Sequence, residues 1–132
     1  MAGLARHLLA EYYGCIPSIL DDQGALERIL VGAADAARTT VVRVELHKFA
    51  PQGVSGVVIL AESHIAIHTW PEHGFASVEL YVCGLECEPE AGDAYLREHL
   101  EPTHVETRLL TRGCLEKARA YPPRVEPAAG VS

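Results

Sequence analysis

The stretch that decides the fold is residues 54–70, VSGVVILAESHIAIHTW. Its two apolar segments, Val54–Leu60 and His64–Thr69, are rich in the β-branched residues that favour strands. Only three residues separate the segments, so the sequence predicts two strands that follow each other directly.

Strands are also predicted on both sides of this pair. In Thr39–Phe49, apolar and polar residues alternate, which is typical of a half-buried strand. Phe75–Cys83 predicts another strand, after a turn marked by Pro71 and Gly74. Four strands in succession indicate a largely antiparallel sheet.

Two helices and two outer strands complete the expected domain. In residues 22–38, which Asp21 or Asp22 would cap, spacings of three and four separate the apolar residues Leu26, Ile29, Leu30, Ala33 and Ala37. A second helix is expected at residues 89–100, and strands from about His7 to residue 14 and at Val105–Thr111. The order β-α-β-β-β-β-α-β predicts an α+β fold, a two-layer sandwich with helices on one face of a mainly antiparallel sheet.

The second face of this sheet also needs a cover. Residues 54–60 and 65–67 carry apolar side chains on both faces, so we expect a homodimer in which two sheets meet as an αββα arrangement. Residues 1–120 are expected to form a single domain. Residues 121–132, with three prolines and a glycine, are expected to form a flexible tail.

Composition argues against several classes of partner. The 132 residues carry a formal charge of −7, which disfavours binding to nucleic acid or to an anionic membrane and suits a cationic small molecule. No apolar run approaches the ~18 residues of a membrane span, and the N-terminus does not resemble a signal peptide. We therefore expect a cytoplasmic protein with reduced cysteines.

Residues 61–72, AESHIAIHTWPE, are the densest group of nucleophilic and proton-carrying side chains. Ser63 follows Glu62, and a serine hydroxyl needs a neighbouring base or a strained carbonyl before it reacts. His64 and His68 are the candidate bases. On a regular strand, however, Ser63 and His68 face opposite ways, so a bulge, turn or break is required at this point.

A metal site is the competing interpretation of the same residues. His64 and His68 are four residues apart, as are Cys83 and Cys87. On a strand the two histidines would lie about 13 Å apart at a rise of ~3.3 Å per residue. We therefore expect no metal.

Five blocks of sequence, taken in order, closely resemble the small prokaryotic S-adenosylmethionine decarboxylases. They are RHLLAEYYGC at 6–15, GVSGVV at 53–58, ESH at 62–64, IHTWPE at 67–72 and VCG at 82–84. The resemblance covers roughly residues 4–112.

The resemblance implies that the chain cuts itself between Glu62 and Ser63, giving fragments 1–62 and 63–132. Ser63 would become a pyruvoyl group that forms a Schiff base with the substrate amine. The resemblance assigns proton abstraction during processing to His68 and proton donation during catalysis to Cys83. We interpret Ser55 as a donor to the oxyanion that develops on Glu62.

The implied substrate is S-adenosylmethionine, which supplies the aminopropyl group for spermidine synthesis after decarboxylation. The resemblance suggests that Phe49 stacks on adenine and Glu72 accepts hydrogen bonds from the ribose, and Trp70 is a second aromatic candidate. Other nearby residues are interpreted as structural: Cys15, Cys87, Cys114, His64 and His73.

Two alternatives stay open at this point. An arginine or ornithine decarboxylase would use the same pyruvoyl scaffold on another amino acid. A noncatalytic subunit that binds a partner is disfavoured, because Ser63, His68 and Cys83 are all intact.

Overall fold

The strands predicted at residues 54–70 form the hairpin β3 (Val54–Leu60) and β4 (Ser63–Trp70). In the computed structural model, which describes residues 3–126, Leu60 pairs with Ser63. Ala61 and Glu62 alone therefore form the turn. The two strands are antiparallel, and successive side chains within each strand lie on alternate faces of the sheet.

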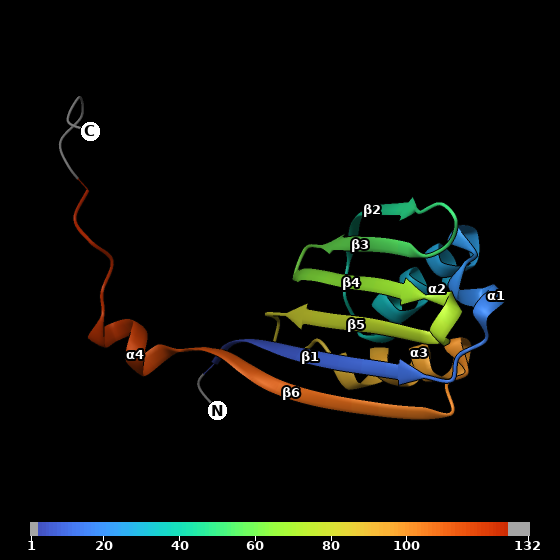
Figure 1. Cartoon of the computed structure of the whole chain (residues 1–132). Helices are drawn as coiled ribbons and strands as arrows, with labels where there is room; N and C mark the ends of the chain where they lie inside the picture. Colours follow the sequence, from blue (N-terminus) through green and yellow to red (C-terminus); the bar gives the residue numbers. More distant parts are fainter. Residues whose placement is uncertain (1–2, 127–132) are drawn as a thin grey trace.

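This hairpin lies inside a six-stranded sheet with the order β2-β3-β4-β5-β1-β6 (Figure 1). All neighbouring strands are antiparallel. The other strands are β1 (Gly3–Tyr13), β2 (Val41–Lys48), β5 (Phe75–Val82) and β6 (His104–Cys114).

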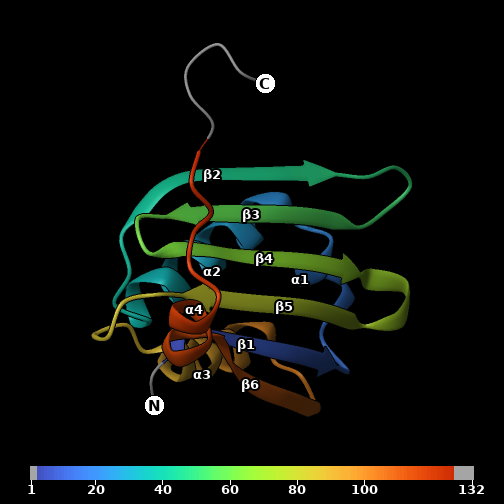
Figure 2. The same cartoon turned by 90° about the vertical axis from the view of Figure 1, so that its left-hand side faces the viewer.

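Three helices cover one face of the sheet, as Figure 2 shows: α1 (Pro17–Leu20), α2 (Gln23–Ala36) and α3 (Pro89–Leu100). Asp22 caps α2, because its carboxylate accepts a hydrogen bond of 3.0 Å from the backbone N–H of Ala25. The predicted α+β fold, with helices on one face of an antiparallel sheet, is confirmed.

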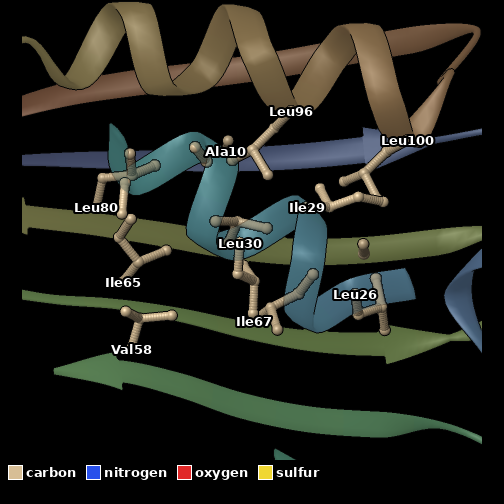
Figure 3. Close-up of a cluster of buried hydrophobic side chains, with 14 of the residues drawn as sticks. Ala10, Leu26, Ile29, Leu30, Val58, Ile65, Ile67, Leu80, Leu96 and Leu100 are labelled. Carbon is tan, nitrogen blue, oxygen red and sulfur yellow. The ribbon is translucent and has the colours of Figure 1, made fainter. Parts of the chain in front are cut away.

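The core lies between these helices and the sheet (Figure 3). The buried stripe of α2 includes Leu26, Ile29 and Leu30, and it packs on inward side chains of the strands such as Ile65 and Ile67. The spacing of three and four in the sequence thus corresponds to real burial.

The ends of the outer strands differ from the prediction. The strand expected from about His7 begins at Gly3, and β6, expected at Val105–Thr111, runs from His104 to Cys114. The two extensions pair with each other, since Gly3 lies opposite Cys114. Such long-range pairing leaves no local pattern in either segment.

Beyond β6 the chain forms a short helix that the sequence did not predict, α4 (Leu115–Ala120), followed by exposed residues 121–126 without helix or strand. Figure 1 shows α4 projecting away from the sheet. The remainder of the expected tail, residues 127–132, lies outside the described residues. In residues 3–126, no helix has the length and apolar character needed to cross a membrane.

The face of the sheet opposite α1, α2 and α3 carries both apolar and polar side chains. Val57, Ile59 and Ala66 lie on it, and Ile59 is 40% exposed. Histidines, carboxylates and aromatic rings surround them, and these belong to the candidate site.

Candidate functional site

The turn between β3 and β4 has a strained backbone at its last residue. Ser63 has a φ of 140°, although it is not glycine. Such a conformation costs free energy in a residue with a side chain and is found chiefly where surrounding structure enforces it. The break in the strand that the sequence required near Ser63 is therefore present, and it falls at the Glu62–Ser63 bond.

The carbonyl oxygen of Glu62 accepts two hydrogen bonds from one residue. The backbone N–H of Cys83 and its Sγ each lie 3.0 Å from that oxygen. Two donors on one carbonyl polarise it and would stabilise negative charge that develops on the oxygen. Such contacts would favour attack by a nucleophile on the Glu62 carbonyl carbon.

The side chain of Glu62 fixes the turn from the other side. Its Oε1 accepts a hydrogen bond of 2.9 Å from the backbone N–H of Thr40, and its Oε2 accepts one of 3.3 Å from the Thr40 hydroxyl. The N–H of Ala61 donates to the Thr40 carbonyl at 2.9 Å. These contacts tie the turn to the segment that precedes β2.

The Ser63 hydroxyl has a histidine beside it, but the histidine is His64 and not His68. Ser63 Oγ lies 3.3 Å from His64 Nδ1, and His64 Nε2 lies 2.8 Å from Glu79 Oε1. The hydrogen bond from His64 is the main reason that the pKa of Glu79 is lowered below its ordinary value. His64 was a candidate base from the sequence and was then interpreted as structural, and Glu79 was not singled out.

A second cluster lies at the other end of β3 and β4. Ser55 and His68 occupy opposite positions of the two strands, and Ser55 Oγ lies 2.8 Å from His68 Nδ1. Both line a cavity of about 310 Å³ together with the three residues assigned to substrate contact, Phe49, Trp70 and Glu72. Five predicted site residues therefore lie together around this cavity.

The two clusters do not meet within one chain. His68 lies five positions after Ser63 on β4, which is about 16 Å at a rise of ~3.3 Å per residue. Ser55 is equally far from Glu62, so it cannot donate to the carbonyl of its own chain. The expectation that Ser55 and His68 act beside Ser63 is not met inside a single copy.

The signal for this separation was present in the sequence, since five residues of strand span a fixed length. The contact of Cys83 with Glu62 could not be predicted from the sequence, because it depends on the register that places Ser63 opposite Val82. Within residues 3–126, no group of three or more histidine, cysteine or acidic side chains is arranged to hold a metal ion.

Comparisons with known proteins show the family to which the chain belongs. The family model described as S-adenosylmethionine decarboxylase matches residues 6–113. A protein of Acetivibrio thermocellus named S-adenosylmethionine decarboxylase proenzyme is 45% identical over 117 residues, which cover 89% of this chain and 94% of the relative. A protein of the same name from Methanococcus vannielii is 44% identical over 116 residues, 88% of this chain and 95% of the relative.

A solved structure has the same fold. The crystal structure of the adenosylmethionine decarboxylase from Aquifex aeolicus matches with a TM-score of 0.79 and 36% identity, over 86% of this chain and 93% of that one. With a family model across most of its length and relatives of this identity, the chain belongs to the S-adenosylmethionine decarboxylase family.

Proposed function

We propose that the chain is a proenzyme that cleaves itself between Glu62 and Ser63 and then decarboxylates S-adenosylmethionine. The observation that carries the proposal is the double hydrogen bond from Cys83 to the Glu62 carbonyl, next to a serine in a strained conformation. The two donors stabilise the charge that develops on the carbonyl oxygen during attack by the serine hydroxyl, and the backbone strain lies at the bond that must break.

The cleavage follows from these contacts in two stages. Ser63 Oγ attacks the Glu62 carbonyl carbon, the Glu62–Ser63 amide bond breaks, and an ester to Oγ replaces it. A base then removes the α-proton of Ser63, and Glu62 leaves as a carboxylate. The dehydroalanine that remains is hydrolysed by water to the pyruvoyl group, with release of ammonia.

The family implies this cofactor, and the residues around Ser63 fit its origin. The oxyanion donors and the strain lie at the bond that must break. Once formed, the pyruvoyl group supplies an electron-accepting carbonyl for the loss of the substrate carboxylate. The exposed Cys83 thiol lies at the same turn, where it can return a proton to the substrate carbon.

The separation of the two clusters supports a homodimer with shared sites. In such a dimer, two sheets pack through their open faces and are related by a two-fold axis that runs perpendicular to β4. The strands of the two sheets then run in opposite directions. The Ser55–His68 end of one protomer then faces the Ser63–Cys83 end of the other. We propose this αββα dimer, in which His68 acts on the partner's Ser63.

The cavity beside His68 suits the nucleoside and the sulfonium of the substrate. Phe49 and Trp70 are 46% and 41% exposed, so their faces are available to a flat base or a cation. Glu72 lines the same cavity and supplies acceptors for ribose hydroxyls. A net charge of −7 also favours a cationic substrate.

Two measurements test the proposal. Intact mass and denaturing electrophoresis of the purified protein should show fragments 1–62 and 63–132, the second without a free amino terminus. Carboxyl-labelled S-adenosylmethionine, arginine and ornithine are each offered separately. The protein should release CO2 from S-adenosylmethionine and from neither of the other two. Release from arginine or ornithine only would be consistent with the pyruvoyl cofactor but would show that S-adenosylmethionine is not the substrate.

A further inference from the structure

Ser63, His64 and Glu79 form a hydrogen-bonded chain on the open face of the sheet. Ser63 Oγ lies 3.3 Å from His64 Nδ1, and His64 Nε2 lies 2.8 Å from Glu79 Oε1. A hydroxyl, an imidazole and a carboxylate in this order are the arrangement in which a histidine removes a proton from a serine nucleophile. All three residues belong to one protomer.

The contacts determine which ring nitrogen of His64 is free. Glu79 is ionised near neutral pH, since its pKa is lowered mainly by the hydrogen bond from His64. A carboxylate only accepts, so Nε2 of His64 must carry the proton that it donates. Nδ1 of the neutral ring is then a lone-pair acceptor for the Ser63 hydroxyl.

Further side chains pack around Glu79 and the His64 ring. His7 Nδ1 accepts a hydrogen bond of 2.8 Å from Arg112, so its Nε2–H points toward Glu79, with 3.6 Å between the nitrogen and Oε1. That nitrogen is buried and has no hydrogen-bond partner in the described part of the chain. Tyr81 stacks on His64 with ring centroids 5.6 Å apart and planes at 10°.

We propose that His64 is the base that takes the Ser63 hydroxyl proton in the first stage of self-cleavage, and that Glu79 positions it. The inference rests on the proposed cleavage between Glu62 and Ser63. His68 cannot take this proton within its own chain, because about 16 Å of strand separates it from Ser63. In the wider mechanism His68 is kept for the α-proton.

The step balances in protons and bonds. The Oγ–H proton moves to His64 Nδ1 as Oγ bonds to the Glu62 carbonyl carbon, and Glu79 stabilises the imidazolium. The tetrahedral oxyanion lies against the N–H and Sγ of Cys83. When the C–N bond breaks, the imidazolium returns its proton to the departing nitrogen of Ser63. The ester and a free amine result, with His64 neutral again.

The proposal divides the two stages between two histidines, and hydroxylamine distinguishes them. Hydroxylamine cleaves an ester in the main chain but not an amide. Freshly made His64→Asn should remain a single chain that resists hydroxylamine, with ester formation slowed about 10²-fold or more. Freshly made His68→Ala should instead give a chain that hydroxylamine splits into residues 1–62 and 63–132.

Two further variants separate chemistry from packing. Imidazole in the buffer should restore cleavage to His64→Ala. Glu79→Asp, which keeps the charge in a shorter side chain, should process faster than Glu79→Gln, which keeps the size but loses the charge. A merely structural Glu79 would rank the two variants in the opposite order. Circular dichroism checks that each variant folds. If His64→Ala does not fold, His64→Asn and the two Glu79 variants test the proposal in its place.

A matched control is available on β6. His104 Nε2 and Glu106 Oε2 also lie 2.8 Å apart, but both side chains are exposed and far along the chain from the turn. His104→Asn and Glu106→Gln should process at the wild-type rate. Cleavage of His64→Asn at the wild-type rate, or accumulation of its hydroxylamine-sensitive ester, would overturn the role of His64. An uncut wild-type chain would overturn the proposed cleavage itself.

Discussion

Ser55 and His68 stand directly opposite each other on β3 and β4, with 2.8 Å between Ser55 Oγ and His68 Nδ1. The pair lies about 16 Å along the strand from Ser63 of its own chain. Either the pair has no part in the chemistry at Ser63, or it serves the Ser63 of another copy. The proposed dimer takes the second alternative, and its consequences are measurable.

Complementation between two inactive variants tests the shared site. In co-expressed Ser63→Ala and His68→Ala chains, each mixed dimer has one site built from an intact Ser63 and an intact His68. With equal and random pairing, half of the dimers are mixed, so about a quarter of all sites should become active. CO2 release and the fraction of cleaved chain are the measurements. Activity no greater than that of the separate variants would contradict the shared site.

Cys83 has two proposed tasks, and substitution should separate them. Cys83→Ser keeps a side-chain donor to the Glu62 carbonyl, and its backbone N–H is unchanged, so cleavage should stay within about tenfold of wild type. Turnover should fall by about 10²-fold or more, because a hydroxyl is a much weaker acid than a thiol. Fragment masses report the first effect and CO2 release the second. Equal losses in both would refute the division.

Glu72 is expected to affect substrate binding alone. Glu72→Gln weakens the acceptors offered to ribose hydroxyls in the cavity next to Phe49, so KM for S-adenosylmethionine should rise, by roughly tenfold if one charged hydrogen bond is lost. Cleavage should be unchanged, since Glu72 is assigned to the ribose hydroxyls of the substrate and has no part in the proposed steps at the Glu62–Ser63 bond. His73→Gln, a change at the neighbouring exposed residue, is the control. An unchanged KM would remove Glu72 from the site.

Stability should depend on pH through His7. The pKa of His7 is lowered from its ordinary value of 6.5, mainly by burial, with Arg112 and His64 adding to the effect and Glu79 opposing it. Protonation of His7 is therefore less favourable in the folded protein than in the unfolded chain. The stabilisation of the folded state by neutral His7 is fully present above pH 6.5 and is lost as the pH falls below that value. Glu79, whose pKa is also lowered, acts in the same direction below its ordinary value of 4.5.

Urea unfolding at fixed protein concentration measures this dependence. His7→Gln should flatten the decline in the free energy of unfolding between about pH 6.5 and pH 5, where the unfolded histidine titrates. His104→Gln, at an exposed position, should keep the wild-type slope. A wild-type slope in His7→Gln would show that other groups cause the decline.

The sequence predicted the hairpin of β3 and β4 because local alternation and length determine both strands. It also predicted the long helices, whose apolar stripe is local. The ends of β1 and β6 were missed because Gly3 gains its strand from Cys114, more than a hundred residues away. No local pattern records that pairing.

The site divides in the same way. The motifs predicted Ser63, His68 and Cys83, and the rise of a strand was enough to separate the first two in space. The contact of His64 with Glu79 required the pairing of β4 with β5, in which His64 lies opposite Tyr81. The approach of His7 required the next pairing, of β5 with β1. A cluster that spans three strands depends on two registers, and neither can be read from one segment.

The strand order also governs what a severed chain can do. A cut after Glu62 assigns β1, β2 and β3 to one piece and β4, β5 and β6 to the other. In the order β2-β3-β4-β5-β1-β6, the pieces meet along three borders, and β1 is held on both edges by strands of the other piece. Neither piece can depart without breaking the ladders on both sides of β1. If the proposed cleavage occurs, the chain therefore has to fold before it is cut, and the two pieces then stay joined along these three borders.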